Sequence, residues 1–81
     1  MKATITRKHI LGGVKPNYIG DAEVNGRCYA FQTVRNIHTP SILGVDVFLP
    51  ANRYGDKRRV FAPRIGEAIQ AALLEQEGCA D

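Results

Sequence analysis

Apolar and polar residues alternate along two neighbouring segments in the first half of the chain. The segments are residues 17–24 (NYIGDAEV) and 27–34 (RCYAFQTV), and Asn25-Gly26 separates them. Alternation with a period of two is typical of β-strands. Asn-Gly suits a type I′ turn, because both central residues of that turn need positive φ. The pattern therefore predicts a β-hairpin.

A two-residue turn also fixes the register of the hairpin. In this register one face is rich in apolar and aromatic groups, whereas the other carries two acids and Gln32. We therefore expect the first face to pack on the core, with Phe31 covering the gap that Gly20 leaves. The predicted opposed pairs are Val24–Arg27, Ala22–Tyr29, Gly20–Phe31 and Tyr18–Thr33.

Three further segments favour extended structure. Residues 2–11 hold several β-branched side chains, and residues 45–49 alternate in polarity. Residues 58–61 are expected to return along residues 45–49 as a second hairpin with its tip at 51–57. The intervening residues 35–44 contain His-Thr-Pro and are expected to form a loop.

The last part of the chain has the spacing of an amphipathic helix. Pro63 suits its first turn, and Gly78 is expected to end it. One apolar stripe runs along the predicted helix and consists of Ile65, Ala68, Ile69, Ala72 and Leu73.

Together these elements predict a single α+β domain over residues 1–81. In this fold an antiparallel sheet of four or five strands packs one face on a single C-terminal helix. One helix can hardly cover the whole of such a sheet, and a chain of 81 residues buries a modest core. A homodimer, in which a second copy buries the remaining sheet, is therefore expected.

Composition narrows the class of protein. The hydrophobic share of 44 % is that of a globular domain. No apolar run approaches the roughly 18 residues that a membrane span needs, and the N-terminus lacks the apolar stretch of a signal peptide. We therefore expect a cytoplasmic protein without membrane contact. Cys28 and Cys79 are expected to be ordinary thiols.

The net charge of +3 conceals an uneven distribution. Residues 1–64 hold all eleven basic residues and four acids, whereas residues 65–81 hold four acids and no base. Such asymmetry creates a directional field, and its basic part attracts polyanions.

The basic residues are densest in residues 51–64 (ANRYGDKRRVFAPR), which contain five of the eleven. Arginine and lysine match phosphate oxygens, and an exposed tyrosine can stack on a base. The alternative is an edge strand whose charges only deter pairing with other sheets. We interpret the segment as a surface for DNA or RNA. The predicted nucleic-acid-binding residues are Arg53, Tyr54, Lys57, Arg58, Arg59 and Arg64.

The helix suggests a second class of function, a protein-interaction module that docks through a sheet edge or through the end of the helix. Leu74 lies opposite Ile65 on the helical wheel and is expected to be exposed. Two acids sit at the negative end of the helix dipole with no base nearby. The predicted partner-binding residues are Leu74, Glu75 and Glu77.

No catalytic or cofactor motif is present in the sequence. The chain has no phosphate loop and no nucleophile elbow. Asp21 and Glu23 alternate along a predicted strand and are expected to line its solvent face. The two histidines and two cysteines lack the close paired spacing of a zinc site. We therefore expect a non-catalytic protein without metal or cofactor.

One short stretch partly resembles the RNA recognition motif. Arg27, Tyr29, Ala30 and Phe31 match one of its aromatic strands, but Cys28 replaces a glycine of the pattern. That fold also needs a helix between its first two strands, and residues 11–18 leave no room for one. The family is therefore rejected, and Tyr29 and Phe31 are expected to belong to the core.

Overall fold

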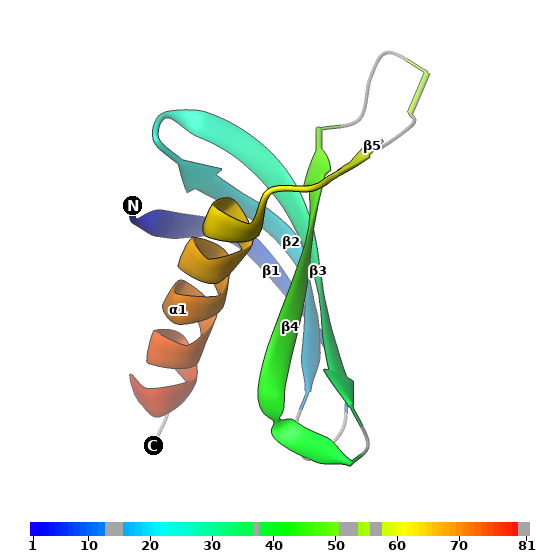
Figure 1. The fold of residues 1–81 in the computed structure, drawn as a ribbon, viewed down its shortest axis with the longest axis vertical. Coiled ribbons are helices and arrows are strands. Elements are labelled where there is room, and N and C mark those ends of the chain that lie inside the picture. The colour runs from blue at the N-terminus through cyan, green and yellow to red at the C-terminus, as the bar shows by residue number, and fades with distance from the viewer. Residues whose placement is uncertain (13–15, 37, 51–53, 56–57, 80–81) are drawn as a thin grey trace.

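The computed structural model describes residues 1–12, 16–36, 38–50, 54–55 and 58–79, without the side chains of residues 39–42 and 78–79. Five strands form one antiparallel sheet in the order of the sequence, and one helix packs against it (Figure 1). The predicted α+β fold is confirmed. Its elements are β1 (Ala3–Leu11), β2 (Asn17–Val24), β3 (Arg27–Asn36), β4 (Thr39–Leu49), β5 (Arg58–Val60) and α1 (Pro63–Cys79).

The central hairpin has the predicted turn and register. Asn25 and Gly26 have φ values of 53° and 78°, the left-handed region that a type I′ turn needs. The backbone N–H of Tyr18 donates to Thr33 Oγ1 at 2.6 Å, which satisfies both polar groups inside the core. Three predicted pairs recur in the strand register: Gly20–Phe31, Ala22–Tyr29 and Val24–Arg27.

The predicted loop at residues 35–44 is wrong. β3 extends to Asn36, and β4 begins at Thr39. The sequence pattern did not predict this strand because it contains Pro40, and proline in a sheet is confined to edges and bulges. β5 covers only residues 47–49 of β4, so Pro40 lies in the uncovered part of an edge.

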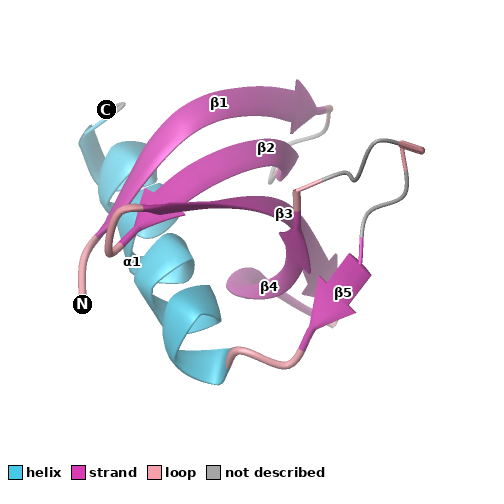
Figure 2. Cartoon of the chain, turned by 90° about the horizontal axis from the view of Figure 1, so that it is seen from above, coloured by secondary structure: helices cyan, strands magenta, loops and turns pink. Residues whose placement is uncertain are grey.

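The single helix packs against the inner face of the sheet, and the sheet curls around it. Figure 2 shows β1 to β5 forming an arc with α1 on its open side. α1 contacts β1 and β4, which lie far apart in the strand order, and also contacts β2. A groove lined by Val45, Val47 and Val60 nevertheless stays open between α1, β4 and β5. The buried apolar core consists of Ala3, Tyr18, Ala22, Val24, Phe31, Leu43, Val47, Ala68, Ile69 and Leu73.

A β-bulge in β1 contributes to this curl. Ile5 pairs with Ala22 and Arg7 with Asp21, which leaves Thr6 as the extra residue of β1. Thr6 Oγ1 donates to the carbonyl oxygen of Asp21 at 3.1 Å. Bulged strands bend and twist more strongly than regular ones, so this bulge turns β1 over the core.

The helix begins at Pro63 as predicted, and its apolar stripe faces the sheet. Ile69 and Leu73 are completely buried, whereas Ile65 and Ala72 are partly buried against the core. The helix continues through Gly78 to Cys79, so Gly78 does not end it. Among the described residues, no helix is long and apolar enough to cross a membrane.

Candidate nucleic-acid interface

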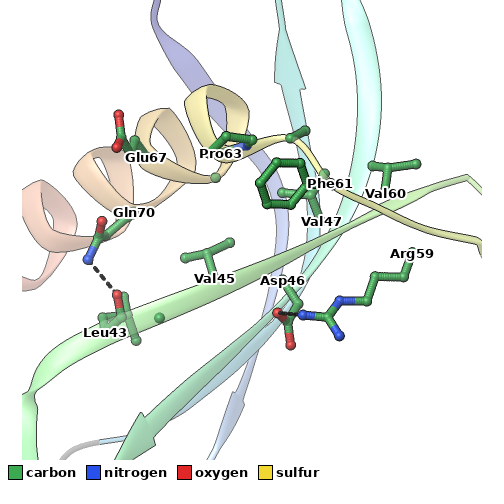
Figure 3. Close-up of a pocket in the computed structure, with 13 residues that line it drawn as sticks. Leu43, Val45, Asp46, Val47, Arg59, Val60, Phe61, Pro63, Glu67 and Gln70 are labelled. Atoms are coloured by element: carbon green, nitrogen blue, oxygen red, sulfur yellow. Dashed lines mark hydrogen bonds and ion pairs between the residues drawn. The ribbon is translucent and has the colours of Figure 1, made fainter.

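β5 carries two arginines of the basic segment. Arg58 and Arg59 lie opposite Leu49 and Phe48 of β4, and because side chains alternate along a strand they leave its opposite faces. Both residues are exposed. Arg59 Nη2 donates to Asp46 Oδ1 at 2.9 Å (Figure 3). β4 therefore orients one of the two guanidinium groups, while 71 % of that side chain remains exposed.

A third exposed arginine begins the helix. Arg64 lies in the first turn of α1, which contains no acid. The first backbone hydrogen bond at this end runs from the Gly66 N–H to the Ala62 carbonyl, at 2.9 Å. Ala62 has no side-chain oxygen that could cap the remaining N–H groups. Because these groups and the helix dipole favour negative charge, Arg64 extends the positive potential beyond β5.

Two aromatic side chains near these arginines in the sequence are exposed. Tyr54 is 76 % exposed and Phe61 is 96 % exposed. Phe61 was not among the predicted binding residues, although the sequence held a signal for it. It follows Val60, which faces the core, so alternation places Phe61 on the other side with Arg59. The term β5 surface denotes Tyr54, Arg58, Arg59, Phe61 and Arg64.

The β5 surface therefore includes most of the predicted nucleic-acid-binding residues. Tyr54, Arg58, Arg59 and Arg64 are all exposed. Arg53 and Lys57 lie outside the described residues.

A groove of about 670 Å³ adjoins the β5 surface, between β4, β5 and the first half of α1. Val45, Val47 and Val60 give it apolar walls (Figure 3). Gln70 crosses from α1 to donate to the carbonyl oxygen of Leu43, which supports the edge of β4. Phe61 borders the groove, yet its ring remains in solvent.

The predicted partner-binding residues at the other end of α1 differ among themselves. Leu74 is 40 % exposed, as expected, and Glu75 is exposed. Glu77 is half-buried and accepts hydrogen bonds from the Tyr18 hydroxyl, at 2.8 Å, and from Arg35 Nη2. The expectation that no base lies near Glu77 is therefore wrong. The sheet supplies this base from a position 42 residues earlier in the chain.

The contacts of Glu77 belong to a cluster that fastens the end of α1 to the sheet. The Arg35 side chain is 5 % exposed, and its Nε donates to the Pro16 carbonyl at 2.9 Å. Lys8 Nζ lies 4.9 Å from the centre of the Tyr18 ring and donates to Gln76 Oε1 at 3.0 Å. Burial raises the pKa of the Tyr18 hydroxyl, and its hydrogen bond to Glu77 raises this pKa further.

The described residues contain no cluster of three or more His, Cys, Asp or Glu side chains that could hold a metal ion. Cys28 is an exposed free thiol. Every buried side-chain nitrogen or oxygen atom in these residues has a hydrogen-bond partner. The described core therefore presents no orphaned polar group that points to a bound ligand.

No protein-family model matches the chain, and no curated protein or solved structure matches it significantly.

Proposed function

We propose that this chain is a small, non-catalytic nucleic-acid-binding accessory protein that acts in the cytoplasm and contacts phosphates through the β5 surface. One observation carries the proposal: exposed cationic and aromatic side chains alternate within a short stretch of β5 and its flanks. Arginines bind phosphate oxygens through a planar fork of donors. Aromatic rings in the same stretch offer the apolar contact that bases prefer.

The helix N-terminus supports this proposal through its charge. The first turn of α1 adds a positive dipole end next to Arg64. The later charged residues of α1 are all acids, and they begin one turn on at Glu67. The field therefore favours a polyanion that lies along β5 and past the start of α1, away from the rest of the helix.

The ion pair between Arg59 and Asp46 lowers the contribution that Arg59 is expected to make to phosphate binding. In the free protein, the negative charge of Asp46 already partly neutralises the guanidinium group of Arg59. A bound phosphate would therefore share this guanidinium group with the Asp46 carboxylate. Arg58 and Arg64 are therefore expected to contribute more of the salt-dependent affinity than Arg59.

The proposal can be tested by measuring affinity for DNA and RNA between about 50 and 200 mM salt. Each phosphate contact contributes about −0.9 to the slope of log K against log salt on duplex DNA, and about −0.7 on single strands. Three or four contacts give a slope near −3 and micromolar affinity. Replacing Arg58 and Arg59 together with alanine is expected to flatten this slope by about 1–2 units.

The opposite edge strand offers a matched control. The pair Lys2→Ala and Arg7→Ala removes the same charge from the β1 edge of the sheet. It also breaks one surface ion pair, because Arg7 Nε donates to Asp21 Oδ2 at 2.6 Å. The control variant should keep the wild-type slope. Equal losses in both variants would show only a diffuse attraction by net charge, and absence of saturable binding at about 50 mM salt would refute the proposal.

A second candidate function is docking of a protein partner. The groove beside Phe61 favours it, since apolar walls with a neighbouring exposed ring resemble the centre of many protein interfaces. The exposed Leu74 provides another apolar contact, for a larger protein or for a second copy of the chain. If the partner docks through Leu74, its replacement would abolish partner binding, whereas the arginine replacements would mainly slow association.

A further inference from the structure

We infer that the ligand of the β5 surface is single-stranded nucleic acid, with Phe61 and Tyr54 stacking on unpaired bases while the neighbouring arginines hold the phosphates. This inference rests on the proposed function and deepens it, because it names the strandedness of the ligand and a residue that binds bases.

Phe61 leaves 96 % of its surface in water although the groove lies next to it. Burying an aromatic ring is among the larger favourable contributions a side chain can make to folding. The backbone explains why the ring stays outside. β5 pairs with β4 up to Val60, which aims the next residue away from the core, and Pro63 restricts Ala62 to extended conformations. The chain therefore presents the ring to solvent before any ligand arrives.

The neighbours of Phe61 determine what such a ring can bind. Arg59 lies two residues earlier and Arg64 three residues later, and both are exposed. Tyr54 provides a second exposed ring on the other side of β5 along the chain. Aromatic rings interspersed with cations match a ligand in which flat apolar groups alternate with phosphates. Single-stranded nucleic acid has this character, and it binds proteins by base stacking in positively charged grooves.

A duplex fits these side chains less well. Its bases stack on each other and do not offer their faces to an exposed ring. A helix often reads the duplex major groove, but α1 packs its apolar stripe on the sheet and carries only acids after Arg64. A duplex bound at β5 would contact the arginines through its phosphates, but Phe61 would have no base to stack on.

The test compares a labelled single strand of about 20 nucleotides with the duplex of the same sequence, by fluorescence anisotropy at about 50 mM salt. DNA and RNA single strands are both used with the full chain. The single strand is expected to bind more tightly than the duplex. Phe61→Ala is expected to weaken single-strand binding about 5- to 150-fold, the range for loss of one stacked base. The same replacement should leave duplex binding within about twofold.

Two further variants separate stacking from simple apolar contact. Phe61→Tyr keeps a ring and should retain the wild-type affinity for single strands, whereas Phe61→Leu should behave like the alanine variant. Val34→Ala is the matched control, because it truncates an apolar side chain that is 53 % exposed on β3, away from the β5 edge. This control should change neither the affinity for the single strand nor the affinity for the duplex. Since Phe61 makes so little contact, circular dichroism should show an unchanged fold in all Phe61 variants.

The outcomes distinguish this inference from the function on which it rests. Duplex binding as tight as single-strand binding, with no effect of Phe61→Ala, would overturn the inference. Salt-dependent binding lost with Arg58 and Arg59 would then still support a nucleic-acid-binding surface. Absence of saturable binding to every strand would refute both.

Discussion

The carbonyl oxygen of Arg7 lies directly over Gly20, where a Cβ atom would come within 1.9 Å of it. Real Cβ atoms do not approach backbone oxygens so closely. The contact arises because the bulge at Thr6 turns β1 over β2. The position that a Cβ atom of residue 20 would take is therefore occupied by the backbone of β1, while Gly20 pairs with Phe31 of β3 on its other side.

Gly20→Ala is accordingly expected to destabilise the protein strongly. The added methyl group meets backbone atoms, which cannot rotate away as a side chain could. Overpacking of this kind costs about 2–3 kcal/mol in the free energy of unfolding. Urea denaturation measures it, and Gly12→Ala is the matched control, because nothing lies within 4 Å of a Cβ atom at Gly12. A Gly20→Ala variant as stable as the control would show that the Arg7 carbonyl does not approach Gly20 so closely.

The turn at Asn25-Gly26 provides a second test of the sheet. Gly26 has a φ of 78°, which a β-branched residue resists, although there is open space around its Cα. Gly26→Val is therefore expected to cost about 1–2 kcal/mol through backbone strain alone. Gly26→Asn should cost less, because asparagine tolerates left-handed conformations better. Equal denaturation midpoints for the valine variant and the wild type would contradict the turn type.

The ion pair between Arg35 and Glu77 predicts an unequal effect of two neighbouring acids. Glu77→Ala leaves the Arg35 guanidinium group buried without its carboxylate, and also removes the acceptor of the Tyr18 hydroxyl. Removing one partner of a buried pair costs on the order of 3 kcal/mol. Glu75→Ala, at an exposed position two residues earlier, should change stability by less than about 0.5 kcal/mol. Similar midpoints for both variants would show that the cluster does not hold α1.

The raised pKa of Tyr18 predicts that the stability of the folded protein declines at high pH. Its pKa is raised in the folded protein by burial and by Glu77, above the value of about 10 for an unfolded chain. The folded state therefore holds the proton more tightly. The associated stability is fully present below about pH 10 and is lost as the pH rises through the folded pKa. Thermal unfolding from pH 8 upward measures this loss, and Tyr18→Phe should have a shallower decline above pH 10. Parallel curves for both proteins would refute the assignment.

Local patterns in the sequence predicted the features that depend on residues close together in the chain. The alternation around Asn25-Gly26 fixed the register and the core face of the hairpin, and the stripe through Ile69 and Leu73 oriented the helix. The curl of the sheet was not predictable, since it depends on a bulge at Thr6 and on the contact of distant strands with α1.

The same limit applies to the candidate sites. The exposure of Arg58 and Arg59 follows from their place on a charged edge strand, and it was predicted. The pairing of Glu77 with Arg35 joins residues 42 positions apart, so no local pattern announces it. Phe61 is an intermediate case, because alternation predicts its side of β5, whereas its exposure depends on where the curled sheet and α1 leave space.

Exposed apolar side chains occur on β1 and on α1, the two elements that Lys8 and Gln76 join. Ile10 and Leu11 of β1 are 62 % and 47 % exposed, and Leu74 of α1 is 40 % exposed. A small domain gains stability when a second copy buries such groups. A twofold dimer would bring the same β1–α1 side of two copies together, and would leave the β5 surface available for a ligand.

Light scattering at high micromolar concentration is therefore expected to give twice the chain mass of 8.9 kDa. Leu74→Glu should shift the mass toward that of one chain, because a dimer would bury two like charges at the contact. Phe61→Ala should leave the dimer unchanged, because Phe61 lies at the start of the helix and on the far edge of the sheet from β1. A mass near 8.9 kDa at every concentration would refute the dimer. If Phe61→Ala rather than Leu74→Glu dissociates it, the two copies meet through the groove beside β5, and the β5 surface is an interface between proteins.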